Sequence, residues 1–364
     1  MAGNGRATVA VFVNPRSRAN RRNPRLAAEF QAILGDMGHV LAADSLEDLD
    51  AMAGALRAAP PRLIAVHGGD GTLHRTLTAL GRAWGDSPLP PIVLLCGGTM
   101  NVVASSLRID GRPTQVLKAV TDAVRAGQQP ELIHRRCMRI GDKLGFVFGN
   151  GLMANFLGEY YAAGAYGPRR AMWLIARTFF STLVRGPFAR RVFRRFEGTV
   201  RVDGRTLPET RFVGVGAATV REVGLGFKLN HRADDDPERF GVLAIHAPPL
   251  SLVADLPAVH DGRGIASSRA WSGVAASLEV TPRRLAKAEN GDGSGDQPGE
   301  MSYTIDGDLY KISGPLRIAI GPPITFVKPP LGEGRYGRRP RRLEAGRTSR
   351  LLAPVEKDTM EAAR

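Results

Sequence analysis

His67-Gly68-Gly69-Asp70-Gly71-Thr72 lies between an apolar run and a segment with helical spacing. The run before it, Leu63–Val66, has the composition of a buried parallel strand, and residues 73–80 after it repeat apolar side chains with the period of a helix. The stretch is therefore predicted to be a strand-to-helix turn. Its glycines let the backbone approach a ligand closely, and the start of the helix presents unpaired amides to the same space. Such a turn is suited to a polyphosphate.

Asp70 is unexpected in a phosphate-binding turn, because a lone carboxylate repels phosphate oxygens. A Mg²⁺ ion between the two, or a substrate hydroxyl held by the carboxylate, removes the conflict. We therefore predict a nucleotide site with Mg²⁺, in which Asp70 acts through the nucleotide-bound metal or orients the substrate. The alternative is a purely structural turn in which glycine serves close packing, although packing requires neither Asp70 nor Thr72.

The order of strand, polar or glycine-rich turn and helix recurs on both sides of this stretch. Val9–Val13 leads into Asn14-Pro15-Arg16-Ser17, and Ile92–Cys96 leads into a second glycine turn, Gly97-Gly98-Thr99-Met100-Asn101. Helical spacing follows each of these turns. The alternation predicts a parallel sheet with helices on both faces, whose ligand site lies at the carboxyl ends of the strands. All three turns are expected to converge there.

The pattern changes near residue 134, where helical periods give way to short strand-like runs such as Thr199–Val202 and Val242–Ile245. This change predicts a second, mostly antiparallel, β-rich domain. We expect a nucleotide-binding α/β domain over residues 1–134, a β-rich substrate domain over 135–317, and a segment 318–330 that returns to the first domain. The acidic, glycine-rich segment 289–300 is predicted to be a flexible loop, and the basic segment 331–364 a disordered tail.

The net charge of +15 is concentrated in two segments. Residues 135–205 carry 14 basic and 4 acidic side chains, and residues 328–364 carry 10 and 5, so the remainder is neutral and a generally basic surface is excluded. Arginines and aromatic residues interleave over 169–195, which favours a helix at a lipid–water interface. The expected contacts with an anionic membrane surface are Arg169, Arg170, Trp173, Arg177 and Phe180.

Two alternatives exist for the segment 169–195. It is a core helix with a solvated arginine face, or it binds nucleic acid. No nucleic-acid recognition motif accompanies the charge, so no nucleic-acid partner is expected. The longest apolar run, Ala171–Val184, is interrupted by Arg177 and is too short to cross a bilayer. We therefore expect a cytoplasmic protein that associates peripherally with the inner face of the membrane.

Taken together, these motifs resemble the diacylglycerol kinase catalytic family, which includes bacterial soluble lipid kinases and the sphingosine and ceramide kinases. The resemblance covers most of residues 9–328 and rests on Asn14-Pro15, on Gly68–Thr72, on Gly98-Thr99-Met100-Asn101 and on Asp306-Gly307-Asp308. It implies an α/β nucleotide-binding domain like those of NAD kinases and diacylglycerol kinases, joined to an antiparallel β-rich domain. It also implies that ATP binds between the two domains and passes its γ-phosphate to a lipid hydroxyl.

The resemblance further implies roles for individual residues. Asp308 accepts the hydroxyl proton, and Asp306 and Asp70 are the other catalytic candidates. The residues that match nucleotide-binding positions are Asn14, Pro15, Arg16, Ser17, Gly68, Gly69, Asp70, Gly71, Thr72, Gly98, Thr99 and Asn101. On the residues alone, Asp306-Gly307 is equally typical of a plain β-hairpin turn.

The sequence departs from the family pattern at four places, one of which is the lack of a threonine, common in the family, near Ala42-Ala43-Asp44. Asp308 stands where the family has glutamate, which shortens the reach of the carboxylate by about 1.5 Å, a displacement that can cost about a hundredfold in rate. His74-Arg75 replaces the usual Asn-Glu and adds positive charge near the phosphates. Phe240 occupies the position of an aspartate that holds a structural Mg²⁺ in the family. We therefore expect that site to be missing, unless Asp234, Asp235 or Asp236 substitutes.

The predicted function is that of an ATP- and Mg²⁺-dependent lipid kinase in phospholipid metabolism. Its acceptor is diacylglycerol or a related lipid: ceramide, a sphingoid base or phosphatidylglycerol. One rival is a NAD kinase-like kinase of a soluble acceptor, and another is a catalytically inactive, membrane-associated binder of ATP or lipid. The sequence leaves open which lipid is used and whether the protein forms a homodimer.

Overall fold

The computed structural model describes residues 8–162, 164, 167–224, 226–283 and 299–330. The chain divides into a unit of Met1–Leu331 and a unit of Gly332–Arg364, and the second unit lies outside the described residues. The predicted tail 331–364 and most of the predicted loop 289–300 therefore lie outside them too. Of that loop only Gly299 and Glu300 are described, and Glu300 begins a strand.

An eleven-stranded sheet begins with parallel strands at one edge. β1 pairs in parallel with β2 and β3, β3 with β4, and β4 with β17. The other strands of this sheet are antiparallel to their neighbours. The strands are β1 (Val9–Val13), β2 (Gly38–Ala42), β3 (Leu63–Gly68), β4 (Ile92–Cys96), β5 (Glu131–Ile140), β6 (Lys143–Gly145), β8 (Phe196–Val202), β9 (Arg205–Thr206), β10 (Arg211–Phe212), β14 (Ser277–Pro282) and β17 (Leu316–Lys328).

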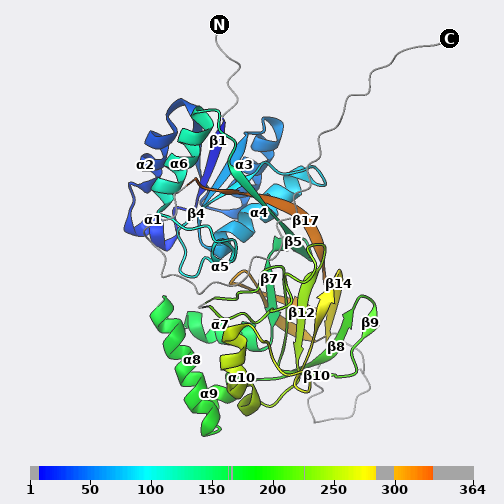
Figure 1. Cartoon of the computed structure of the whole chain (residues 1–364). Coiled ribbons are helices and arrows are strands. Elements are labelled where there is room, and N and C mark those ends of the chain that lie inside the picture. Colours follow the sequence, from blue (N-terminus) through cyan, green and yellow to red (C-terminus); the bar gives the residue numbers. More distant parts are fainter. Residues whose placement is uncertain (1–7, 163, 165–166, 225, 284–298, 331–364) are drawn as a thin grey trace, which may run out of the picture. The chain divides into compact units, whose positions relative to one another are not determined.

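Helices cover both faces of the parallel strands (Figure 1). Because side chains alternate along a strand, Val9, Val11 and Val13 of β1 pack in one core with α2 and α6, and Ala10 and Phe12 pack in another with α3 and α4. The helices of this region are α1 (Arg18–Arg22), α2 (Leu26–Leu34), the 3₁₀ turn η1 (Gly35–Met37), α3 (Leu46–Ala58), α4 (Asp70–Trp84), α5 (Val102–Ser106) and α6 (Pro113–Arg125).

β17 joins the parallel and antiparallel parts of this sheet. Its first residues pair with β14, its whole later length pairs with β5, and Phe326 lies beside Ile92 of β4. The register of β17 shifts between Ile320 and Pro323, where a proline cannot donate to the ladder. The expected domain boundary at residue 134 falls within β5, and the segment 318–330 lies almost wholly within β17.

A second, entirely antiparallel sheet of six strands packs against the antiparallel part of the first. Phe148, Phe240 and Ile305 from the second sheet share a core with Leu278 and Ile318 from the first. The strands are β7 (Val147–Asn150), β11 (Gly214–Ala218), β12 (Phe240–Ile245), β13 (Ala270–Ala275), β15 (Glu300–Ile305) and β16 (Asp308–Ser313). The predicted fold class, an α/β nucleotide-binding region with a β-rich antiparallel part, is thus confirmed.

Four helices pack on the other face of the second sheet, where the sequence pattern predicts helix only over 169–195. They are α7 (Leu152–Ala162), α8 (Pro168–Leu183), α9 (Pro187–Val192) and α10 (Pro249–Asp261). The segment 169–195 is not one helix, because Arg185 adopts a left-handed conformation and Gly186 follows before α9 starts at Pro187. Within the described residues, no helix combines the length and apolar character that crossing a bilayer requires.

Candidate active site

The two glycine turns lie against each other at the carboxyl ends of β3 and β4. The amide of Gly97 donates to the carbonyl of Gly68 at 2.8 Å, and a methyl group on Gly69 would come within 2.9 Å of the Cα atom of Gly98. No side chain longer than hydrogen fits at this contact. The two glycine turns therefore converge, as predicted.

Asparagine side chains shape the turns that follow β1 and β4. Asn101 has a left-handed backbone (φ 48°), and its side chain accepts from the amide of Gly98 at 3.0 Å and donates to the carbonyl of the same residue at 3.2 Å. Asn14 closes its own turn by accepting from the amide of Arg16 at 2.9 Å. Both side chains thus form hydrogen bonds with the backbone of their own turns. Direct contacts with a nucleotide remain a prediction for both.

Asp70 begins α4, and its carboxylate reaches across to α5. Its Oδ1 accepts from the amide of Val103 at 3.1 Å, and the amides of Val102 and Asn101 also interact with it. Burial raises the pKa of Asp70, and these backbone amides partly counter that effect. The carboxylate thus ties the two glycine turns together, a reason for an aspartate that the sequence did not reveal. Its predicted action through Mg²⁺ or on the substrate remains a prediction.

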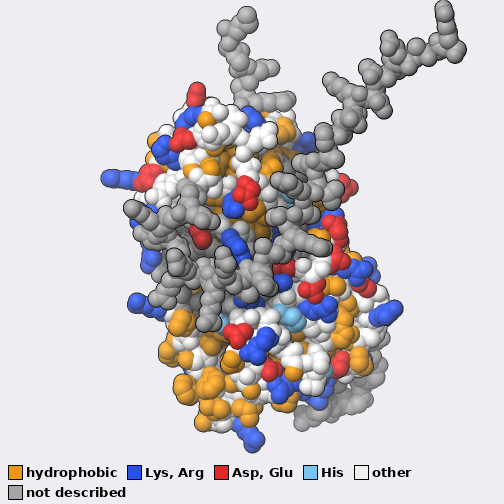
Figure 2. Space-filling model, viewed as in Figure 1, with side chains coloured by type: hydrophobic (Ala, Val, Ile, Leu, Met, Phe, Trp, Pro, Cys, Tyr) orange, Lys and Arg blue, Asp and Glu red, His pale blue; other side chains and the backbone are white. Residues whose placement is uncertain are grey.

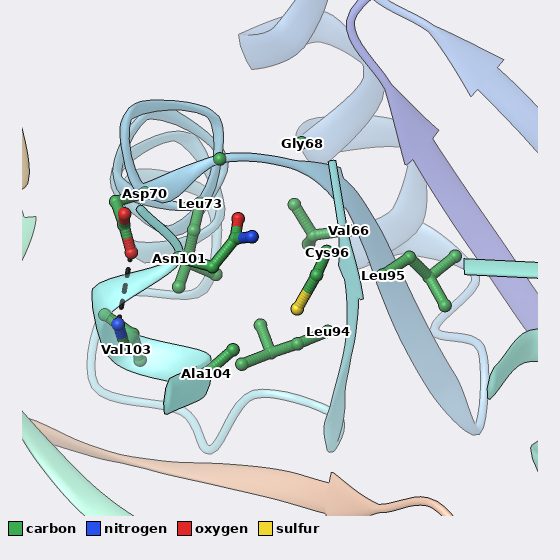
Figure 3. Close-up of a pocket in the computed structure, with 11 residues that line it drawn as sticks. Val66, Gly68, Asp70, Leu73, Leu94, Leu95, Cys96, Asn101, Val103 and Ala104 are labelled. Carbon is green, nitrogen blue, oxygen red and sulfur yellow. Dashed lines mark hydrogen bonds between the residues drawn. The ribbon is translucent and has the colours of Figure 1, made fainter. Parts of the chain in front are cut away.

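A small cavity lies behind the two turns (Figure 3). Its volume of about 20 Å³ has room for little more than a water molecule. Leu73, Leu94 and Cys96 line its inner side, and burial raises the pKa of the Cys96 thiol to about 11. A nucleotide cannot enter this space, so phosphates could bind only at the outer side of the turns.

Asp308 reaches the first glycine turn from the second sheet. It is the first residue of β16, and a methyl group on Gly71 would lie 2.8 Å from its Oδ1. Its Oδ2 accepts from Nε of Arg75 at 2.7 Å. The side chain of Asp308 is 20% exposed and that of Arg75 47%. The structure therefore brings an acid of the β-rich part to the start of α4, as the sequence predicts.

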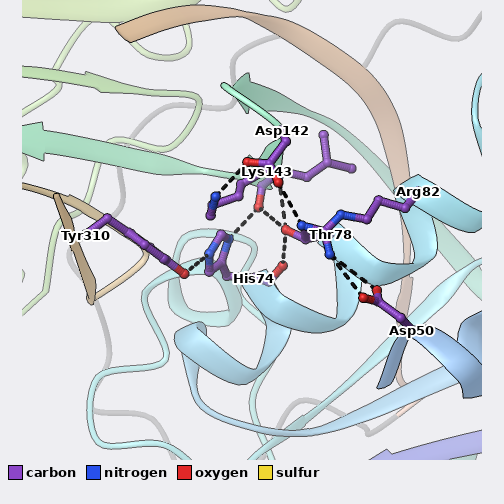
Figure 4. Close-up of polar contacts among 8 residues, drawn as sticks. Asp50, His74, Thr78, Arg82, Asp142, Lys143 and Tyr310 are labelled. Atoms are coloured by element: carbon purple, nitrogen blue, oxygen red, sulfur yellow. Dashed lines mark hydrogen bonds and ion pairs between the residues drawn. The ribbon is translucent and has the colours of Figure 1, made fainter. Parts of the chain in front are cut away.

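His74 and Tyr310 connect the same two elements (Figure 4). His74, on α4, is buried, with Nδ1 2.6 Å from the carbonyl oxygen of Leu144 and Nε2 2.8 Å from the hydroxyl of Tyr310. Burial lowers the pKa of His74, and burial raises the pKa of Tyr310 to about 12. Both groups are therefore neutral at pH 7.

Asp306 occupies the hairpin turn between β15 and β16 and is fully buried. Its carboxylate accepts from the amides of Phe146, at 3.1 and 3.0 Å, and Val147, at 2.8 Å. Its backbone is left-handed (φ 47°), a conformation that aspartate and asparagine tolerate. Burial raises the pKa of Asp306 well above its usual value, and the amide of Phe146 only partly opposes this. The carboxylate fixes the hairpin to residues 146–147, and its predicted catalytic role remains untested.

We expect Asp306→Asn to be more stable than the wild type at pH 7. Because the pKa of Asp306 is raised on folding, the wild type loses stability as the pH rises and the buried carboxylate ionises, whereas asparagine has no charge to bury. The gain should shrink towards pH 4, where the aspartate of the folded protein is protonated. Thermal unfolding of both proteins between pH 4 and 8 measures it, and a gain that is constant with pH would contradict this account.

A cavity of about 640 Å³ extends from the glycine turns into the space between α7, α8 and α10. Gly69, Asp70, Gly71, Thr99 and Asp306 line the part near the turns. The rest is mostly apolar, and its lining includes Met153, Phe156, Leu157, Ile175, Phe193, Leu252, Leu256 and Ile265. Sequence reasoning missed this cavity, because two of the helices that enclose it were not predicted.

Large apolar side chains are exposed on α8 and just beyond it. Met172, Trp173 and Phe180 are 62%, 49% and 65% exposed. Arg170 lies 4.4 Å and Arg177 5.3 Å from the centre of the Trp173 ring. Figure 2 shows hydrophobic side chains gathered over the region that α8 and α9 occupy, with basic side chains at the edges of this patch. This face of α8 exposes more apolar surface than a helix of the protein core would.

The other predicted site residues lie in α4, at the mouth of the cavity, and in the turn that follows β1. Thr72 is the third residue of α4, and Thr99 is exposed at the cavity mouth. Arg16 is exposed, and Oγ of Ser17 accepts from the amide of Asn20 at 3.3 Å. Pro15 lies in the turn between them and β1.

Phe240, the first residue of β12, is fully buried in the core between the two sheets. Its side chain cannot ligate a metal. The three candidate substitutes pair with arginines instead: Asp234 with Arg135 and Arg221, Asp235 with Arg232, and Asp236 with Arg239. In the described part of the chain, no group of three or more His, Cys, Asp or Glu side chains is arranged to hold a metal ion.

The first part of this chain is similar to a known family of kinases. Residues 8–129 match the family model described as the diacylglycerol kinase catalytic domain. This match confirms the resemblance carried by the motifs and supports a kinase; ATP use and a divalent metal are what that family implies. No match was found among the curated proteins.

Solved structures share the fold along nearly the whole chain. A diacylglycerol kinase from Bacillus anthracis str. Sterne aligns with a TM-score of 0.58 at 14% sequence identity, covering 89% of this chain and 97% of that one. A candidate diacylglycerol kinase from the same organism aligns with a TM-score of 0.61 at 15% identity, covering 90% and 97%. At these identities the likeness concerns the fold alone.

Proposed function

We propose that this protein is an ATP-dependent kinase of a lipid hydroxyl. The observation that carries the proposal is the cavity of about 640 Å³, because it runs from the glycine turns into a mostly apolar interior. Ligand sites are of this size and place a few polar groups at one end of an apolar pocket. A soluble acceptor such as NAD has no use for an interior lined by Phe156, Leu252 and Leu256.

In the proposed reaction the amides of the two glycine turns hold the triphosphate, and the lipid hydroxyl lies between it and Asp308. The hydroxyl oxygen forms a bond to the γ-phosphorus, and the bond from the γ-phosphorus to the β–γ bridging oxygen breaks, with its electron pair leaving on ADP. The proton passes to Oδ1 of Asp308. A carboxylate is too weak a base to remove that proton beforehand, so the transfer is late, as a loose transition state allows.

Mg²⁺ would neutralise phosphate charge when bound. Oδ1 of Asp70 accepts from the amide of Val103, and in the described part of the chain no group of three His, Cys, Asp or Glu side chains is arranged to hold a metal ion. The proposal therefore takes the ion as part of the ATP complex, with phosphate oxygens as its main ligands.

Leu256→Glu tests whether the apolar cavity holds the lipid. Leu256 lines the cavity from α10, and a carboxylate there would have to lose its water when an acyl chain packs against it. We expect the KM for lipid to rise at least tenfold, with the KM for ATP unchanged. Leu46→Glu, at a leucine of α3 that is 54% exposed, is the control and should change neither constant. An unchanged KM for lipid in Leu256→Glu would place the lipid elsewhere.

A substrate panel separates the proposed function from its rivals. The protein is incubated with labelled ATP, Mg²⁺ and each of diacylglycerol, ceramide, a sphingoid base, phosphatidylglycerol and NAD, and products are identified by mass spectrometry. We expect a phosphorylated lipid. Phosphorylated NAD alone would favour the soluble-acceptor kinase, and ATP or lipid binding without any product would favour the inactive binder.

The same proposal includes peripheral binding to an anionic membrane through α8. Its exposed Trp173 and Phe180 would enter the interface, and the neighbouring arginines would pair with headgroups. We expect the protein to sediment with vesicles that contain phosphatidylglycerol. Salt and the substitution Trp173→Ala should each weaken this binding. Equal binding to neutral vesicles would contradict the charge-based part.

A further inference from the structure

The two carboxylate oxygens of Asp308 face different partners. Oδ2 accepts from Nε of Arg75 at 2.7 Å, whereas Oδ1 is the atom that a methyl group on Gly71 would approach to 2.8 Å. One oxygen is therefore held by a cation, and the other is directed at the turn expected to bind phosphates. An aspartate alone can rotate between such positions, so the guanidinium selects this orientation.

Arg75 is itself oriented by a chain of hydrogen bonds that begins at the backbone. The carbonyl of Leu144 can only accept, so Nδ1 of His74 carries the proton and donates to it at 2.6 Å. Nε2 of His74 must then accept from the hydroxyl of Tyr310, at 2.8 Å. The Tyr310 oxygen in turn interacts with the Arg75 side chain. Two hydrogen bonds therefore have a defined direction, from Tyr310 to His74 and from His74 to Leu144, and Nε of Arg75 donates to Oδ2 of Asp308.

A purely structural role is a weak explanation for this arrangement. The side chains of Arg75 and Asp308 are 47% and 20% exposed, and ion pairs in such positions add little to stability. Arg82 provides a comparison on the same helix: its side chain is also 47% exposed and pairs with Asp50 and Asp142, away from the turns. Of these two arginines, Arg75 is the one whose partner carboxylate lies against the first glycine turn, at Gly71.

We propose that Arg75 is a positioning residue, which holds Oδ2 of Asp308 so that Oδ1 receives the proton of the acceptor hydroxyl. This inference rests on the proposed function and adds a residue to it. Tyr310, which is hydrogen-bonded to His74, also interacts with the Arg75 side chain. The pairing also accounts for a cation at position 75, next to the turn.

Kinetics of Arg75→Ala and Arg82→Ala test the proposal. In Arg75→Ala we expect kcat to fall about a hundredfold, since a misplaced reacting group costs about that much, while the KM values for ATP and lipid stay within about threefold. Guanidinium ion at millimolar concentration should restore at least a tenth of the lost activity, because the vacated position is half-exposed. Arg82→Ala should keep wild-type kcat and show no response to guanidinium.

Several outcomes would overturn the proposal. They are an unchanged kcat in Arg75→Ala, an equal loss in Arg82→Ala, or a loss that guanidinium does not restore while the variant melts several degrees lower. Crystal structures of wild type and Arg75→Ala decide the same question without activity: Asp308 must leave its wild-type rotamer in the variant. If wild type phosphorylates no lipid, the proposed function fails, and the rotamer of Asp308 still tells whether Arg75 positions it.

Discussion

Asp308→Asn is expected to lower the kcat for lipid phosphorylation about a thousandfold and to leave the affinity for ATP within about threefold of wild type. Asparagine has the shape of aspartate, and its amide oxygen can still accept from Nε of Arg75, which lies 2.7 Å from Oδ2. It cannot take up the hydroxyl proton. Steady-state kinetics with the lipid that the panel identifies, together with calorimetric titration of ATP, measures the two effects separately.

Asp50→Asn is the matched control for this experiment. Asp50 accepts from Arg82 of α4 at 3.2 Å, much as Asp308 accepts from Arg75, but it lies outside the site. We expect wild-type kcat in this variant. Full activity in Asp308→Asn would remove Asp308 from the catalytic role, and Asp70 or Asp306 would then have to be tested in its place.

The parts of the fold that sequence predicted are those set by local pattern. The helix after the first glycine turn buries Leu73, Leu77, Leu80 and Trp84, which recur at intervals of three and four, so its period is visible in the sequence. β17 is different, because its partners β4, β5 and β14 are brought together only by the folded chain. No local pattern reports such pairings.

The helices that enclose the cavity escaped prediction for physical reasons. α10 contains Pro257, which normally argues against a helix, and α7 is apolar around most of its circumference because it packs on the sheet on one side and faces the cavity on the other. Its polar face is narrow, with Asn155 and Glu159 at positions i and i+4, so the helical period is weak in the sequence. The cavity, and with it the strongest support for a lipid acceptor, therefore required the structure.

In the site, the course of the backbone at the glycine turns could be predicted from the sequence. Most of the side-chain contacts could not. The contact of the two turns follows from their position at the ends of neighbouring parallel strands. The partner of Asp70 lies 33 residues away and that of Arg75 lies 233 residues away, so neither contact can be read from the sequence. The one signal in the sequence was the departure from the family pattern at His74-Arg75. In the structure His74 contacts Tyr310 and Arg75 contacts Asp308, and both partners belong to the second sheet.

Gly69→Ala is expected to weaken ATP binding about a hundredfold. The backbone at Gly69 (φ −96°, ψ −172°) is one that alanine adopts freely, so only the added methyl group matters. That group would lie 2.9 Å from Cα of Gly98 and must push the two turns apart, which misaligns the amides that hold the phosphates. Calorimetric titration of ATP measures the loss.

Gly54→Ala is the control, because Gly54 lies inside α3 with no other atom within 4 Å of the added methyl group. It should stabilise the protein by roughly 0.5–1 kcal/mol and leave ATP affinity unchanged. The two variants add the same methyl group, so a difference in ATP affinity isolates the contact between the turns. If Gly69→Ala binds ATP as tightly as Gly54→Ala, the triphosphate does not lie across both turns, since their separation would then be without consequence for it.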